Sequence, residues 1–192
     1  MLTRADLWSL EEYAERRAAF RADVLAHKKN RQVLVGNHLL LLFEDQLTLK
    51  YQIQEMLRIE KVFEASGIND ELEAYNPLIP NGDNWKCTLL IQYNEVDERK
   101  RRLAELIGVE DQIWMQVGET KRIYPITDED MDRTTADKTS AVHFMRYQLS
   151  AEQIEAAKAG AAVIVGVDHL AFPCESVCLP ENVRLSLLND LA

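Results

Sequence analysis

The sequence lacks the motifs that mark several large classes of enzyme. Its seven glycines are scattered singly and form none of the glycine-rich loops that bind nucleotide phosphates. No serine lies in a Gly-x-Ser-x-Gly turn, and no Glu-x-x-His repeat of a di-iron bundle occurs. Nucleotide hydrolases, dinucleotide dehydrogenases, α/β-hydrolases and di-iron bundles are therefore poor candidates.

Long apolar segments are also missing. The longest runs, 39–43 and 161–167, fall short of the roughly 18 residues that cross a bilayer. The N-terminal segment carries acidic residues from Asp6 onward and has no apolar core, so we expect no secretion signal. The chain has three cysteines, an odd number, which favours reduced thiols. These features together predict a cytoplasmic protein.

The chain has fewer positively than negatively charged side chains. The 192 residues include 22 Lys and Arg against 32 Asp and Glu, which gives a net charge of −10. Such a chain repels phosphate backbones and anionic lipids, so we expect neither a nucleic-acid nor a membrane partner. The length matches one domain of roughly 100–200 residues. We therefore predict a single domain over residues 1–192, helix-rich over 1–80 and sheet-rich over 84–192.

The first part of the chain shows helix signals around one hairpin. Ser9 begins a capping box, and apolar residues at helical spacing follow it as far as Val24. The apolar runs 31–35 and 38–43 flank Gly36-Asn37 and predict a β-hairpin; the alternative is one long helix from His38. Asp45 predicts the cap of a second helix, which we expect to end at Gly67. A short helix is expected over 70–75.

The second part alternates short apolar runs with turn residues and helix caps. It predicts a mostly antiparallel sheet with packed helices, and hence the α+β class. We expect strands over 85–93, 113–117, 121–126, 141–149, 161–167 and 176–179, and helices from Asp97 to Gly108, from Ser150 to Ala159 and over 181–191. The polar segment 128–139 is expected to be a mobile loop.

A polar stripe follows one face of the helix after Asp45. It contains Gln52 and Glu55, with Arg58 beside it, and Glu44 lies just before the cap. A carboxylate, an amide and a guanidinium gathered in this way suit a polar ligand. The alternative is a solvated helix face with an ordinary Glu55–Arg58 pair, and the residues by themselves favour that alternative.

Metal ligands are harder to place. His143 lies within a predicted strand and His169 at the end of another, so either could serve as a base or a ligand, but a lone strand histidine is more often structural. The spacing from His169 to Cys174 and Cys178 matches no tight zinc pattern. Buried, inert thiols explain the cysteines better, and the residues indicate no particular cofactor.

Three strings of residues resemble a known family. They are Phe43-Glu44-Asp45, the helical stretch 52–60 that reads QIQEMLRIE, and the segment 71–80 with Tyr75-Asn76 at its centre. The likeness extends to Ala159-Gly160 and to Asp168-His169. Together they resemble the bacterial domain-of-unknown-function family 3501. Asp45 stands where that family has asparagine, and either residue can cap a helix.

This resemblance implies a function by association only, because the family has no established activity. Its genes are often found beside a rubrerythrin-like iron protein and an iron–sulfur protein. It therefore implies an accessory or adaptor to a cytoplasmic redox system. The alternatives are a small-ligand- or metal-binding enzyme and a structural homo-oligomer with the 52–58 stripe as its interface. The resemblance also marks a set of pocket candidates, namely Glu44, Gln52, Glu55, Arg58, Tyr75 and Asn76.

Overall fold

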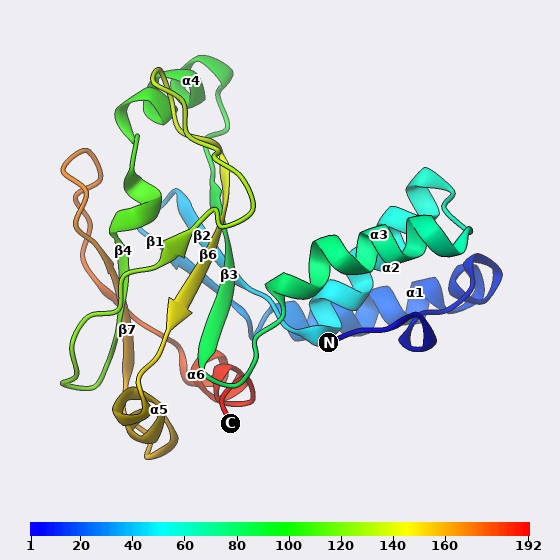
Figure 1. Ribbon diagram of the computed structural model, residues 1–192. Coiled ribbons are helices and arrows are strands. Elements are labelled where there is room, and N and C mark those ends of the chain that lie inside the picture. The colour runs from blue at the N-terminus through cyan, green and yellow to red at the C-terminus, as the bar shows by residue number, and fades with distance from the viewer.

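The computed structural model describes residues 1–192 and has two parts (Figure 1). The helical unit contains α1 (Leu10–Lys28), α2 (Gln46–Glu60) and α3 (Ala65–Tyr75), with the short 3-10 helices η1 (Arg4–Asp6) and η2 (Asn76–Leu78). It projects from the sheet body, which contains every strand and the helices α4 (Val96–Glu105), α5 (Ala151–Lys158) and α6 (Glu181–Leu188). The predicted α+β class is confirmed.

The sheet body contains two antiparallel sheets. The larger has five strands in the order β1 (Gln32–Val35), β2 (Leu39–Phe43), β3 (Asn84–Ile91), β6 (Val142–Gln148) and β5 (Ile126–Thr127). The smaller has three, β4 (Ile113–Val117), β7 (Val163–Val167) and β8 (Val177–Cys178), and the 3-10 helix η3 (Val109–Gln112) precedes β4. The β1–β2 hairpin comes early in the chain but pairs with β3, so both halves of the sequence build the larger sheet.

The core lies between the two sheets. Because side chains alternate between the faces of a strand, β2 buries Leu39, Leu41 and Phe43, while the residues between them face outward. Both sheets contribute to one apolar cluster of 28 buried residues. The helical unit has a separate cluster of only four: Leu2, Ile53, Leu57 and Leu72. The two parts of the molecule therefore have separate apolar cores.

Local signals placed several elements correctly. Gly36 has a φ of 58° in the β1–β2 turn, a backbone conformation that glycine adopts without a steric penalty. Asp45 caps α2, since its side chain accepts a hydrogen bond from the Thr48 backbone N–H at 2.9 Å. Ser150 forms the predicted capping box with Gln153. The Ser9 hydroxyl accepts the Glu12 N–H at 3.2 Å.

The predicted end of α2 was wrong. The helix ends at Glu60, because Lys61 adopts the left-handed conformation with a φ of 56° and Val62 donates its N–H to the Leu57 carbonyl. Gly67, the expected stop, lies inside α3. A Cβ at this glycine would lie 2.6 Å from a Val62 methyl group, so Gly67 serves close packing between the two segments rather than a helix end.

Two other expectations need correction. α4 begins at Val96, two residues earlier than a cap at Asp97 would allow, and ends at Glu105. Within the expected strand 121–126, Ile123 forms only an isolated bridge to Met115, and Ile126 begins β5, which pairs with β6. None of the helices combines the length and the apolar composition that crossing a membrane requires.

Candidate functional site

Glu55 lies in a cluster that joins α1 to α2. The Tyr13 hydroxyl donates to Glu55 Oε1 at 2.7 Å, and Arg17 donates to both carboxylate oxygens at 2.7 and 2.9 Å. Arg58, the partner predicted from the sequence, adds a contact of 3.2 Å to Oε2. The two donors from α1 were not anticipated, because sequence spacing cannot show which helices pack together.

Both oxygens of the Glu55 carboxylate accept hydrogen bonds, and these contacts change the pKa values of the cluster. The Arg17 guanidinium, aided by Tyr13 and Arg58, lowers the pKa of Glu55 to about 2. Burial and the Glu55 carboxylate raise the pKa of the Tyr13 hydroxyl. The Glu55 side chain is only 14% exposed. With these donors already bonded to it, Glu55 holds two helices together and offers a ligand little room.

Glu44 belongs to a different cluster at the start of α2. It accepts hydrogen bonds from the hydroxyls of Thr48 at 2.6 Å and Thr88 at 2.8 Å. It shares no bonding partner with Glu55. The carboxylates of Glu44 and Glu55, predicted to share one pocket, therefore belong to two separate clusters.

The predicted pocket residues Gln52, Tyr75 and Asn76 do not form one pocket either. The Asn76 side chain binds the backbone of Leu2, accepting its N–H at 2.8 Å and donating to its carbonyl at 2.9 Å. Gln52 is half-buried, and its side chain makes no hydrogen bond with the protein. Tyr75 lies apart from both carboxylates, where the helical unit meets the sheet.

Neither histidine lies in a metal-binding group. His143 is fully buried, with Nδ1 2.6 Å from Asp128 Oδ2 and Nε2 2.8 Å from Thr139 Oγ1. His169 donates from Nε2 to the Ile107 carbonyl at 3.1 Å. No group of three or more His, Cys, Asp or Glu side chains is arranged to hold a metal ion. Both imidazoles bond to the surrounding chain.

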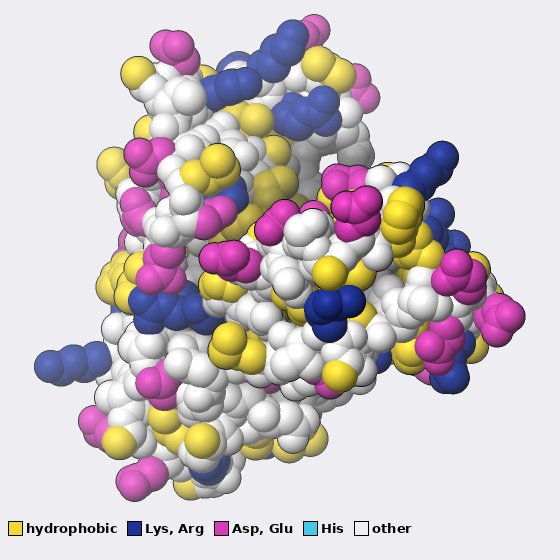
Figure 2. All heavy atoms as spheres, turned by 45° about the vertical axis from the view of Figure 1, so that its right-hand side comes forward, with side chains coloured by type: hydrophobic (Ala, Val, Ile, Leu, Met, Phe, Trp, Pro, Cys, Tyr) yellow, Lys and Arg dark blue, Asp and Glu magenta, His cyan; other side chains and the backbone are white.

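The largest hollow with polar groups lies between the two parts of the molecule. We name it the boundary cleft; its volume is about 630 Å³. Tyr75, Pro77 and Leu78 line it from the end of α3 and η2, and Lys86, Phe144 and Arg146 line it from β3 and β6. Hydrophobic side chains are visible in the hollow between the sheet body and the helical unit (Figure 2).

Lys86 and Arg146 are neighbours across the β3–β6 pair but differ in their bonding. Arg146 is held by Glu129, which accepts from Nε at 2.8 Å and from Nη2 at 2.7 Å. The Lys86 side chain is half-buried, and its amine makes no hydrogen bond or ion pair with the protein. Burial first, and then the charge of Arg146, lowers the pKa of Lys86, while Glu129 and Asp83 oppose this shift.

The segment after β5 forms the third side of the boundary cleft. Glu129 and Asp130 line it, and Arg133 anchors the segment by pairing with Asp130 and, at 3.1 Å, with Asp128. The Arg133 guanidinium also lies 4.5 Å from the centre of the Phe144 ring. The expected loop 128–139 is thus tied to the sheet beside the cleft.

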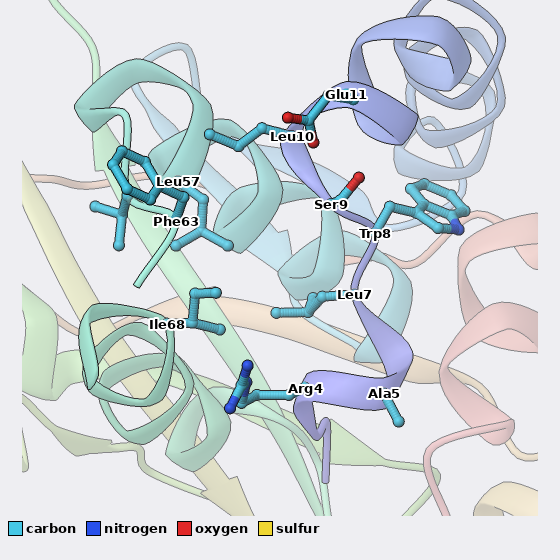
Figure 3. A pocket seen from close by; sticks show the side chains of 11 residues that line it. Arg4, Ala5, Leu7, Trp8, Ser9, Leu10, Glu11, Leu57, Phe63 and Ile68 are labelled. Carbon is cyan, nitrogen blue, oxygen red and sulfur yellow. The ribbon is translucent and has the colours of Figure 1, made fainter. Parts of the chain in front are cut away.

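A second hollow of about 540 Å³ lies within the helical unit. Leu7, Leu10, Leu57, Phe63 and Ile68 point toward a common space, and Arg4 and Glu11 lie at its edge (Figure 3). Eight of the eleven residues that line it are hydrophobic, and the charged residues Arg4 and Glu11 lie at opposite ends rather than converging on one point where they could orient a small ligand. The boundary cleft is therefore the better candidate site.

Comparisons with known proteins agree with this fold. The sequence profile of the family described as "Protein of unknown function (DUF3501)" matches residues 1–191. The chain belongs to this family. It is similar to a crystal structure, at 1.90 Å resolution, of a novel protein of unknown function from Burkholderia pseudomallei K96243. The two are 48% identical with a TM-score of 0.95, covering 100% of this chain and 99% of the other. A comparison with curated proteins gives no match.

Of the residues that line the boundary cleft, only Tyr75 was predicted from the sequence. The alternation in β3 does place Lys86 on the face opposite Trp85 and Cys87. It contains no sign that the end of α3 and η2 border a cleft on that face. For the same reason, the sequence does not indicate that Arg146 and Phe144 line the cleft.

Proposed function

We propose that the protein binds a small organic anion in the boundary cleft. The observation that carries this proposal is the half-buried side chain of Lys86, whose amine has no partner in the protein. Even partial burial of a lysine side chain disfavours its ammonium group unless an anion or a hydrogen-bond acceptor compensates for the lost water. A bound carboxylate would supply that partner.

The walls of the cleft support a ligand that is part apolar. Pro77, Leu78 and Phe144 provide hydrophobic surface, while the Tyr75 hydroxyl makes no hydrogen bond with the protein. A cavity with apolar walls and a few polar groups is typical of small-molecule sites, and such sites are common where two parts of a protein meet. A small carboxylic acid with an apolar body satisfies both features.

Thermal unfolding with a panel of short carboxylic acids tests the proposal. An acid present at 100 times its Kd stabilises the protein by about 2.7 kcal/mol, which raises the melting temperature by several degrees. Lys86→Met removes the unpaired cation and should abolish the shift. Lys121→Met, an exposed lysine outside the cleft, is the matched control.

A second variant acts in the opposite direction. Glu129→Gln removes the carboxylate that occupies Arg146, so that a bound anion gains a second cation. Its affinity for the acid, measured by calorimetry, should rise. If Lys86→Met and the wild type bind the same acids equally, the proposal is wrong.

The roles implied by the family resemblance stay predictions. An adaptor should capture a rubrerythrin-like or iron–sulfur protein from a native extract at low salt. A homo-oligomer should have twice the monomer mass or more by light scattering. The cytoplasmic location is likewise a prediction.

A further inference from the structure

The surroundings of Lys86 are unusual for a surface lysine. Lysine usually extends its ammonium into water, but here the side chain is half-buried beside Arg146 on the next strand. Apolar residues of η2, Leu78 among them, form the opposite wall of the cleft. Both burial and a neighbouring cation disfavour the charged form of the amine, which lowers its pKa.

These two conditions are the ones that make a lysine nucleophilic. The neutral amine, not the ammonium, attacks carbonyl carbons, and proteins obtain it by desolvating the lysine or by placing it next to another positive charge. Lys86 has both features and no bond that would have to break before it reacts.

Arg146, beside Lys86, has hydrogen-bond donors that can bind the carboxylate of a ligand. Its Nε and Nη2 bind Glu129, and its Nη1 donates to Gln148 Oε1 at 2.7 Å. One N–H on each terminal nitrogen has no partner within the protein. A carboxylate can accept from these donors and from the Tyr75 hydroxyl, which is also unbonded and lines the same cleft.

From this juxtaposition we infer that Lys86 captures the carbonyl carbon of a small oxo acid as an imine, while Arg146 and Tyr75 receive its carboxylate. The inference rests on the anion site proposed above and narrows its ligand to acids that also carry a ketone or aldehyde. A plain carboxylic acid would bind without reacting.

The step balances without an oxidant or a reductant. The Lys86 nitrogen forms a bond to the carbonyl carbon, and the carbonyl π electrons move to oxygen, which takes up a proton. The nitrogen of this carbinolamine loses its remaining protons as the oxygen departs as water. The products are one imine and one water molecule, and hydrolysis reverses the reaction.

Reductive trapping tests the inference. The full-length protein is incubated with pyruvate and a mild hydride donor, which reduces an imine to a stable secondary amine. The expected product carries one added group whose mass equals that of the oxo acid less one oxygen. Peptide mapping should place it on Lys86, with little on exposed lysines such as Lys121.

Lys86→Arg separates binding from capture. It keeps the positive charge but provides no nucleophilic amine, so it should bind pyruvate by calorimetry and give no trapped product. Propionate, which has no ketone, serves as the matched acid. Glu129→Gln should increase the trapped fraction at a subsaturating concentration of pyruvate, because it frees Arg146 for the carboxylate.

Three results would overturn the inference. If pyruvate and propionate bind equally and Lys86 is not modified, the cleft is an anion site without capture, and only the proposed function stands. If exposed lysines are trapped as readily as Lys86, the cleft gives no activation. If neither acid binds, the inference and the proposed function both fail.

Discussion

The sheet body buries 28 apolar residues in one cluster, whereas the apolar cluster of the helical unit has four. The helical unit compensates with polar contacts at its edges, such as Glu55 with Arg17 and Asn76 with Leu2. The sheet body also has buried polar contacts, such as Arg31 with Asp190, but these add to a large apolar cluster. Glu55 and Asn76, two polar residues that stand out in the helical sequence, therefore help to hold the helical unit together, and the unpaired Lys86 amine lies where the two parts meet.

The largest loss of stability is expected from a substitution at Arg31, a buried residue that connects the end of β2 to the C-terminal helix. It is 2% exposed, donates to the backbone carbonyls of Phe43 and Glu44, and pairs with Asp190. Arg31→Met leaves the Asp190 carboxylate buried without its partner. We expect a loss of about 3–5 kcal/mol in the free energy of unfolding, measured in urea.

Lys29→Met is the control for Arg31, because Lys29 is an exposed cation two residues away. It should change the free energy of unfolding by less than about 0.5 kcal/mol. A loss below about 1 kcal/mol for Arg31→Met would contradict the view that this residue joins the two segments.

A smaller effect is expected at Glu55, which tests how the helical unit is held. Its folded pKa of about 2 lies below the usual 4.5, so the unfolded chain binds more protons between these values. The contribution of Glu55 is therefore present above pH 4.5 and is lost as the pH falls toward 2. Allowing for solvent screening, we expect about 2 kcal/mol at neutral pH.

Glu55→Gln should remove that contribution and flatten the fall in stability between pH 4.5 and 2, measured by urea unfolding at several pH values. Glu60→Gln, an exposed glutamate on the same helix, should keep the wild-type slope. Equal slopes in Glu55→Gln and the wild type would show that the Arg17 contact adds nothing.

The sequence predicted those features that depend on neighbours in the chain. The hairpin at Gly36, the Asp45 cap and the Ser150 capping box each need only a few adjacent residues, and all three are confirmed. The end of α2 was missed because Lys61 is not a glycine, although it adopts the conformation in which glycine is common.

The candidate site was predicted less well, because its parts meet only in three dimensions. Tyr75 was identified through the family resemblance, but Lys86 and Arg146 look like ordinary outward residues of amphipathic strands. Likewise, nothing in the sequence indicates that Arg17 binds Glu55 across two helices. Tertiary partners of this kind leave no local pattern.

A still smaller effect tests whether Glu44 and Glu55 belong to one site. They share no partner, and 11 residues of helix would separate them by about 16 Å. The losses from Glu44→Gln and Glu55→Gln should therefore add to within about 0.5 kcal/mol in the double variant. A coupling above about 1 kcal/mol would restore the single carboxylate pocket.

The smallest effect is expected at Phe63, which lines the hollow in the helical unit but is 74% exposed. Phe63→Ser should change the free energy of unfolding by no more than about 0.5 kcal/mol. A clear loss would mean that this residue packs more tightly than its exposure indicates.

Anion binding at Lys86 can be observed directly in the NMR spectrum of protein labelled at the lysine Cε positions. The Lys86 signal is assigned by its disappearance in Lys86→Arg. As propionate is added, we predict that this signal moves and saturates while the signals of exposed lysines such as Lys121 stay in place. A Lys86 signal that does not move, or lysine signals that all drift together, would contradict a binding site in the boundary cleft.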